Sequence, residues 1–206
     1  MEYIETIRVE GGELHLLELH QRRLAATMRE VYGDTCAVPD LAVTLRTSCD
    51  VPCDGLYKCR VVYDNDIRRV EFLPYTPRVV KSLKMVVAPV DLDYHLKSSD
   101  RSALTALSSE KGDFDEVIIV RGGLITDTSY TNLVFKGGAG LYTPKHPLLK
   151  GVMRQNLLNC GMVEELDLSY ADIAPGNELG ITDVILINAM MPLDVAPVVP
   201  VSNIFQ

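Results

Sequence analysis

The chain has 206 residues, and its 28 acidic and 20 basic residues give a net charge of −8. This acidic balance argues against the clustered Lys and Arg surface that nucleic-acid binding requires. The first ten residues, MEYIETIRVE, contain no apolar core and predict no signal peptide. The longest apolar stretch, residues 183–201, includes Asn188, Asp194 and three prolines, which excludes a membrane-spanning helix. We therefore expect a cytoplasmic protein of one large or two small domains, with no nucleic-acid or membrane partner.

Cysteine usage predicts free thiols and no metal site. The chain has five cysteines, an odd number, and none of them belongs to a CxxC pair. Cys49 and Cys53 are separated by three residues in a stretch without histidine, which is not a usual zinc-binding pattern. Unbridged thiols without a metal are typical of a reducing cytoplasm.

The N-terminal part of the chain predicts a hairpin, two helices and a second pair of strands. Gly11-Gly12 separates two strand-like segments. Apolar residues then recur at helical spacing up to Gly33, and a shorter helix is expected from Asp40 to about Ser48. Residues 55–64 and 67–75 alternate between apolar and polar side chains around a turn at Asp64-Asn65-Asp66, so they predict paired strands.

Beyond a proline-containing linker at residues 77–83, short apolar strands dominate. They are expected in SLKMVVAPV, DEVIIVRG, LITD, TNLVFK, GLYTP and DVILIN, and a helix is expected in GVMRQNLLNCG with Gly161 at its C-cap. We therefore predict an α+β fold with a small N-terminal domain over residues 1–76 and a larger domain over residues 84–206.

Two basic motifs raise the possibility of cofactor chemistry. Lys97 lies in DYHLKSSDRSAL just before a predicted helix, and a lysine amine can bond to a carbonyl cofactor if a pocket lowers its pKa. Most lysines are instead solvated charges. In HQRRL, Arg22 and Arg23 project about 100° apart on a helix, so at most one can face a pocket and bind phosphate. The alternative is a solvated helix face.

Two further positions complete the set of candidate groups. Asp127 ends the strand-like LITD and is able to keep a pyridine nitrogen protonated, although an Asx turn would also place an aspartate there. Gly151 precedes a predicted helix, where free backbone N–H groups and the absence of a side chain favour an anion. An amine, an acid, an arginine and an anion site together are compatible with a pyridoxal 5′-phosphate enzyme.

In chain order these motifs resemble the class IV aminotransferases, fold-type IV of the pyridoxal-phosphate enzymes. The shared pattern is ETIR, HxxRL, KxxDR, TDxxxxNL, YTP followed by GVMRQ, and NAMMP, and it extends over essentially the whole chain. YTPKHPLLKGVMRQ and INAMMPL are most similar to the 4-amino-4-deoxychorismate lyase branch. The resemblance implies a small α/β domain, a larger β-barrel-like cofactor-binding domain with helices, and a homodimer.

The resemblance also implies roles for individual residues. Lys97 would bond covalently to the cofactor and transfer protons, Arg23 would bind the cofactor phosphate, and Asp127 would hold the pyridine nitrogen. Further cofactor contacts would come from Gly151, Val152, Met153, Asn188 and Ala189. Substrate contacts would come from Arg60 and Lys58.

The chain departs from the family pattern in three respects. Asp127 stands where Glu is usual, so the cofactor ring must sit closer or a water must bridge. Asp100 replaces the commoner Asn. The chain also begins inside the pattern, since relatives have about two further strands before ETIRV.

The implied function is a lyase that converts 4-amino-4-deoxychorismate into 4-aminobenzoate and pyruvate for folate synthesis. The same residues would also serve a class IV aminotransferase that acts on branched-chain or D-amino acids. A third interpretation is a catalytically impaired, non-enzymatic relative.

Overall fold

The structure is a computed structural model that describes residues 1–47 and 50–206. The chain divides into two compact units. The first contains Met1–Pro77 and Leu96–Asp100, and the second contains Arg78–His95 and Arg101–Gln206. The sequence predicts a single crossing between domains, whereas the segment around Lys97 returns to the first unit. It does so because it hydrogen-bonds to the beginning of the chain, where the Ser99 N–H donates to the Glu2 carbonyl (2.9 Å).

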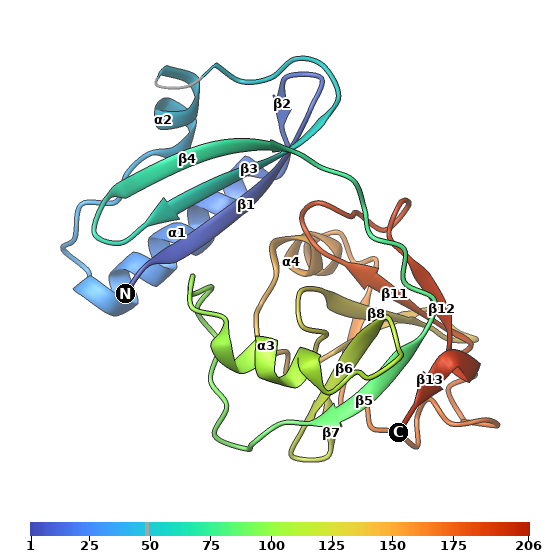
Figure 1. Ribbon diagram of the computed structural model, residues 1–206. Helices are drawn as coiled ribbons and strands as arrows, with labels where there is room; N and C mark the ends of the chain where they lie inside the picture. The colour runs from blue at the N-terminus through green and yellow to red at the C-terminus, as the bar shows by residue number, and fades with distance from the viewer. Residues whose placement is uncertain (48–49) are drawn as a thin grey trace. The chain divides into compact units, whose positions relative to one another are not determined.

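In its described residues, the first unit contains a four-stranded antiparallel sheet and two helices (Figure 1). The strand order is β2-β1-β3-β4. The elements are β1 (Tyr3–Glu10), β2 (Glu13–Leu14), α1 (Leu17–Tyr32), α2 (Leu41–Thr47), β3 (Leu56–Tyr63) and β4 (Ile67–Pro74).

One face of this sheet packs against α1. Alternate residues of β1 are buried, as the period of a strand requires, and Ile7 and Val9 contact Leu24 and Met28 of α1 in one apolar cluster. Glu5 belongs to the same buried face of β1. A carboxylate is therefore placed inside an apolar layer, where it needs partners.

The local predictions for this unit are confirmed. Val9 pairs with Leu14 across the glycine turn, and β3 pairs with β4. The first helix ends before Gly33, which has a φ of 90° and donates its N–H to the Arg29 carbonyl (2.9 Å). The second helix begins at Leu41, while its predicted end at Ser48 lies outside the described residues.

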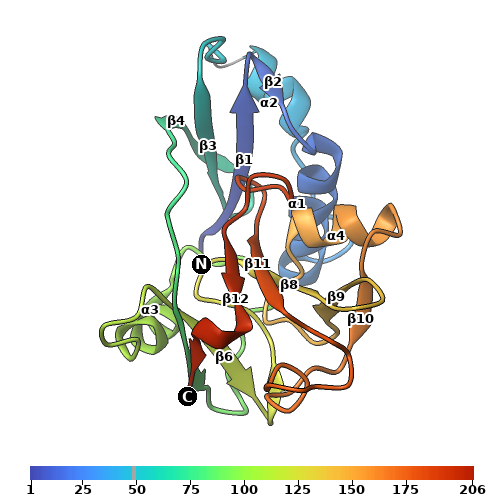
Figure 2. The ribbon, with the colours of Figure 1, turned by 90° about the vertical axis from the view of Figure 1, so that its right-hand side faces the viewer.

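The second unit contains two sheets and two α-helices. Its elements are β5 (Leu83–Val87), α3 (Ser102–Ser109), β6 (Glu116–Arg121), β7 (Leu124–Ile125), β8 (Asn132–Lys136), β9 (Leu141–Pro144), α4 (Val152–Asn159), β10 (Glu164–Leu166), β11 (Asp183–Ile187), β12 (Val198–Pro200), the 3₁₀ helix η1 (Val201–Asn203) and β13 (Ile204–Phe205). One sheet has the order β10-β9-β8-β11-β12, which can be followed across Figure 2, and the other has the order β13-β5-β6-β7.

The two sheets share an apolar core. Ile118 of β6 packs in one cluster with Leu133 of β8 and Leu186 of β11. The neighbouring β6 residues point the other way, and Val117 and Ile119 pack against α3. Burial on both faces explains why β6 is a continuous apolar run in the sequence. The predicted α+β fold class is confirmed.

The end of α4 differs slightly from its prediction. Cys160 is the C-cap, and Gly161 is the next residue, with a φ of 64°. The Gly161 N–H donates to the Leu158 carbonyl (3.0 Å), and the Met162 N–H donates to the Leu157 carbonyl (2.9 Å). This is the Schellman pattern, which places the left-handed residue one position after the cap.

Three observations on the described residues concern membrane-spanning helices, metal sites and cysteines. None of the described helices is long and apolar enough to span a membrane. Within residues 1–47 and 50–206, no group of three His, Cys, Asp or Glu side chains is arranged to hold a metal ion. Cys36, Cys53, Cys59 and Cys160 form no disulfide within that part of the chain, and Cys49 lies outside it.

Candidate active site

Lys97 is held by the edge of β1. Its carbonyl accepts a hydrogen bond from the Ile4 N–H (2.9 Å), and Ser98 forms a β-bridge with Tyr3. The Ser98 hydroxyl accepts a hydrogen bond from the Asp100 N–H (3.0 Å). The small polar residues around Lys97 therefore fasten its backbone, and the half-buried lysine precedes α3 by five residues rather than opening it.

A buried cluster of three charged or titratable side chains lies between β1 and α1. The Glu5 carboxylate accepts hydrogen bonds from Arg23 Nε (2.8 Å) and Arg23 Nη2 (2.6 Å). It also lies 2.5 Å from His20 Nδ1. Arg22 points the other way, toward exposed Glu18, so one arginine of the pair is inside and one is in solvent, as the helical spacing predicts.

The charge state of this cluster follows from its contacts. Burial alone would raise the pKa of Glu5, but the Arg23 charge and the hydrogen bonds from His20 and Arg23 outweigh it and lower that pKa to about 2. An ionised carboxylate only accepts hydrogen bonds, so His20 Nδ1 carries the proton. Burial lowers the pKa of His20 and keeps it neutral. Its Nε2 is a buried acceptor without a hydrogen-bond partner among the described residues.

In the second unit, Asp127 is a buried carboxylate held by three donors. Oδ2 accepts hydrogen bonds from the backbone N–H groups of Leu148 (2.5 Å) and Leu149 (3.1 Å), and Oδ1 accepts one from Asn132 Nδ2 (2.6 Å). Burial raises the pKa of Asp127 to about 6 although these hydrogen bonds oppose it. The Asx turn that was the alternative for Asp127 is not made by its carboxylate. A similar local contact is made by the next residue, Thr128, whose hydroxyl accepts a hydrogen bond from the Thr131 N–H (2.9 Å).

The start of α4 lies against the same group. Gly151 is the N-cap residue, and no side chain in the described part of the chain caps the helix from this position. A Cβ at Gly151 would overlap Asn132 Oδ1 and would lie 3.1 Å from Asn132 Cγ. Val152 and Met153 form the buried first turn, whose N–H groups have no partner inside the helix. An uncapped helix start of this kind suits an anion.

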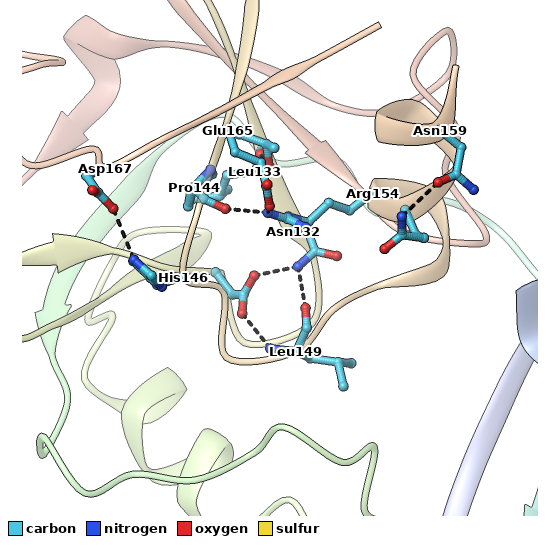
Figure 3. Close-up of polar contacts among 12 residues, drawn as sticks. Asn132, Leu133, Pro144, His146, Leu149, Arg154, Asn159, Glu165 and Asp167 are labelled. Atoms are coloured by element: carbon cyan, nitrogen blue, oxygen red, sulfur yellow. Dashed lines mark hydrogen bonds and ion pairs between the residues drawn. The ribbon is translucent and has the colours of Figure 1, made fainter. Parts of the chain in front are cut away.

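Arg154 anchors α4 to the neighbouring strands. Its Nη2 donates hydrogen bonds to the Pro144 carbonyl (2.8 Å) and to Glu165 (2.5 Å), as Figure 3 shows. Only 2% of the Arg154 side chain is exposed. A buried guanidinium needs such acceptors, and these contacts connect the first turn of α4 to the last residue of β9 and to β10.

Asn188 uses its side chain to shape a loop. Its Oδ1 accepts hydrogen bonds from the N–H groups of Met190 (2.8 Å) and Met191 (3.0 Å), and its Nδ2 donates to the Tyr130 carbonyl (3.4 Å). The loop that contains Asn188 and Ala189 is therefore attached to the turn that follows Asp127. The structure thus brings Gly151 and Asn188 to the segment of the second unit that begins with Asp127, residues 127–132.

Arg60 and Lys58 lie in the first unit. They alternate along β3 with Cys59 and Val61, which are buried in the core, so both project from the opposite face of the sheet. Arg60 Nη1 pairs with Glu71 (3.1 Å) and remains partly exposed. The polar face of β3 can therefore present two cations.

Two residues bind the predicted site residues directly, and a third binds one of these two, but the motifs indicate no role for any of them. Glu5 binds Arg23 and is itself bound by His20, and Asn132 binds Asp127. Glu5 occupies an inward position of an alternating strand, and His20 lies one helical turn before Arg23. These are the sequence signals that could have indicated buried partners.

Comparison with known proteins identifies the family. The model of class IV aminotransferases matches residues 2–204. An uncharacterised protein from Haemophilus influenzae is 33% identical over 187 residues, which are 90% of this chain and 96% of that protein. The structure is similar to that of a candidate 4-amino-4-deoxychorismate lyase from Haemophilus somnus 129PT, with a TM-score of 0.83 and 32% identity over 93% of this chain and 97% of that chain.

A second solved structure widens the comparison. A candidate amino-acid aminotransferase from Mesorhizobium loti has a TM-score of 0.74 and 25% identity, and the match covers 100% of this chain and 98% of that chain. The resemblance inferred from the motifs is confirmed. The chain belongs to the class IV aminotransferases, a family of pyridoxal-phosphate-dependent enzymes.

Proposed function

We propose that this enzyme is a 4-amino-4-deoxychorismate lyase that uses pyridoxal 5′-phosphate. The observation that supports the cofactor is the arrangement of a buried carboxylate, Asp127, beside the uncapped first turn of α4. The observation that favours the lyase is the 32% identity with the Haemophilus somnus candidate lyase over nearly the full length of both chains. By family resemblance, the proposal extends to a cytoplasmic homodimer that serves folate synthesis.

The residues of the second unit fit this cofactor. A carboxylate offers about four lone-pair positions, and the three hydrogen bonds to Asp127 leave room for a pyridine N–H. The N–H groups of Val152 and Met153, which follow Gly151, suit a phosphate. The loop at Asn188 and Ala189 would add backbone contacts.

The family resemblance assigns further roles to residues of the first unit. Lys97 would provide the amine that bonds to the cofactor. Arg23 would bind the phosphate, and its ion pair with Glu5 is compatible with this role because a guanidinium has five N–H donors, of which Glu5 takes two. Arg60 and Lys58 would bind the two carboxylates of the substrate, for which cationic donors are well suited.

The proposed reaction uses a proton that Lys97 moves. When bound, the cofactor supplies a ring that accepts electrons from the substrate carbon that bears the amine. Lys97 would remove the proton from that carbon, and the bond between the substrate ring and the enolpyruvyl oxygen would break. The proton would pass to the departing enolpyruvate, which becomes pyruvate. The remaining ring becomes aromatic 4-aminobenzoate, which drives the step forward.

A transaminase is the second candidate, because the Mesorhizobium loti protein is described as an aminotransferase. In that case Lys97 would move a proton from the α-carbon of an amino acid to C4′ of the cofactor. The two reactions differ in their requirements. A lyase releases pyruvate without a keto acid, whereas a transaminase stops after one half-reaction unless a keto acid is added.

Covalent trapping tests the cofactor and the lysine. The purified protein is incubated with pyridoxal 5′-phosphate, reduced with borohydride, digested and mapped by mass spectrometry. We expect visible absorbance before reduction and a label on the peptide that contains Lys97. Lys97→Ala should lose the label and the activity. Lys136→Ala, which changes an exposed lysine at the end of β8, should retain both.

Product analysis tests the reaction. The loaded protein is supplied with 4-amino-4-deoxychorismate and no keto acid, and we expect equal amounts of 4-aminobenzoate and pyruvate. Exchange of amino groups between amino and keto acids without 4-aminobenzoate would support the transaminase instead. Colourless protein without a label would contradict the cofactor assignment.

A further inference from the structure

We infer that Asn132 is a positioning residue that joins the acid of the site to its anion-binding helix. Its amide group holds the Asp127 carboxylate, and its oxygen excludes any side chain from position 151. The inference rests on the proposed function, because it assigns Asn132 to the same cofactor site, but it concerns contacts that exist in the cofactor-free protein.

The orientation of the Asn132 amide follows from its neighbours. One side of the amide lies 2.6 Å from Asp127 Oδ1 and 2.8 Å from the Leu149 carbonyl oxygen. A carbonyl oxygen only accepts hydrogen bonds, so this side must be the NH₂ group, and its two hydrogens serve two acceptors. Figure 3 shows the Asn132 amide beside Leu149. The amide oxygen is then directed toward Gly151.

Asn132 and the backbone before α4 together fix the acid. Asp127 Oδ2 is bound by the N–H groups of Leu148 and Leu149, and Oδ1 is bound by Asn132. Asn132 in turn binds the Leu149 carbonyl. The carboxylate is therefore connected twice to the segment that leads into α4, so the acid and the start of the helix are held as one rigid group.

Steric contact with Asn132 is the reason why residue 151 is glycine. Gly151 has φ −67° and ψ 148°, an extended conformation that any residue adopts without strain. Backbone freedom therefore does not require glycine here. The three atoms nearest to a Cβ at this position all belong to the Asn132 side chain, and Oδ1 would overlap it. Removing that side chain should make alanine acceptable at position 151.

A double-mutant cycle on the cofactor-free protein tests this coupling. The proteins are wild type, Asn132→Ala, Gly151→Ala and the double variant, and thermal unfolding is followed by circular dichroism. Gly151→Ala should lower the Tm by about 5 °C in the wild-type background, and by less than about 2 °C in the Asn132→Ala background. Gly140→Ala is the matched control, because a Cβ there meets no described atom within 4 Å. It should leave the Tm unchanged.

Cofactor binding provides the second measurement. Titration with pyridoxal 5′-phosphate should give a Kd about tenfold weaker for Gly151→Ala alone, and the same substitution in the Asn132→Ala background should change the Kd less than about twofold. Asn132→Ala should also shift the pH midpoint of the visible band of the bound cofactor, because Asp127 loses a donor. Gly140→Ala should shift neither quantity.

The outcomes separate the two proposals. An equal loss in Tm and Kd from Gly151→Ala in both backgrounds would overturn the coupling. An unchanged pH midpoint in Asn132→Ala would overturn the role in positioning Asp127. Failure of the wild-type protein to bind the cofactor while the Tm cycle shows the expected coupling would overturn the proposed function and leave the Asn132–Gly151 contact established.

Discussion

Replacing Asp127 with Asn should remove a pH-dependent penalty from the folded, cofactor-free protein. Burial raises the pKa of Asp127 from 3.8 to about 6 in the folded state. The folded protein therefore binds a proton that the unfolded chain has already released between these values. The favourable contribution of the protonated group is fully present below about pH 3.8 and is lost as the pH rises through 6. Asn does not titrate, so the variant lacks this dependence.

The magnitude follows from the difference between the two pKa values. The difference between a pKa of 3.8 in the unfolded chain and about 6 in the folded protein corresponds to roughly 3 kcal/mol of unfolding free energy between low pH and neutral pH. Of this, about 1.3 kcal/mol should appear between pH 5 and pH 7. The amide of Asn also faces the NH₂ group of Asn132, which adds an unfavourable contact. That contact does not depend on pH. It therefore lowers the unfolding free energy of the variant by a constant amount and does not change how the stability difference between the two proteins varies with pH.

Urea unfolding of cofactor-free protein, followed by circular dichroism from pH 4 to pH 8, measures the effect. The stability of Asp127→Asn relative to wild type should increase with pH and level off above about pH 6. With the cofactor bound, the wild-type dependence should weaken, because a protonated pyridine nitrogen favours the ionised carboxylate. Parallel curves for the two cofactor-free proteins would refute the reasoning, since they would show that burial does not perturb this carboxyl group.

Two further predictions concern the first unit. Glu5→Gln should lower the unfolding free energy, measured by urea unfolding, by about 3 kcal/mol at pH 7, because it removes the buried counter-ion of Arg23. This difference from wild type should shrink as the pH falls from 4.5 toward 2, where Glu5 of the wild-type protein gains its proton. Glu18→Gln on exposed α1 should have little effect. Arg60→Ala should raise the KM for 4-amino-4-deoxychorismate about tenfold with a smaller change in kcat, whereas Arg69→Ala, the other partner of Glu71, should not. Equal effects of the two arginine variants would contradict a substrate contact at Arg60.

Local structure was predictable where the signal lies within a few neighbouring residues. The end of α1 before Gly33 follows from a helical period and a residue able to adopt positive φ. The β3–β4 hairpin follows from two alternating segments around a polar turn. Both features depend on side-chain spacing that is visible in the sequence itself.

Short strands at the edges of the sheets were not predictable. β10, β12 and β13 have only three, three and two residues, and two prolines flank or end β12. Segments of this length contain too little periodicity to identify a strand. They become strands because partners lie beside them, such as β5, which pairs with β13 although it lies far away in the sequence.

The sequence indicated candidate residues of the site but not the buried groups that bind them. The ordered motifs single out Lys97, Arg23 and Asp127 and indicate the family. They do not reveal that Arg23 is bound by Glu5 or that Asp127 is bound by Asn132. Partner choice among buried polar groups depends on distance and orientation, which arise when the elements pack.

The sequence by itself determined the α+β class, the helices and long strands, and the family, and it singled out the candidate reactive side chains. Periodicity, turn residues and motif order are sufficient for these properties because they can be recognised from the order of residues along the chain. The tertiary structure alone decided which donors hold the Asp127 carboxylate, why a side chain cannot fit at Gly151, and that the Lys97 segment belongs to the first unit. Those features depend on burial and contact between residues distant in the chain, and burial is what moves the pKa of Asp127 toward neutrality.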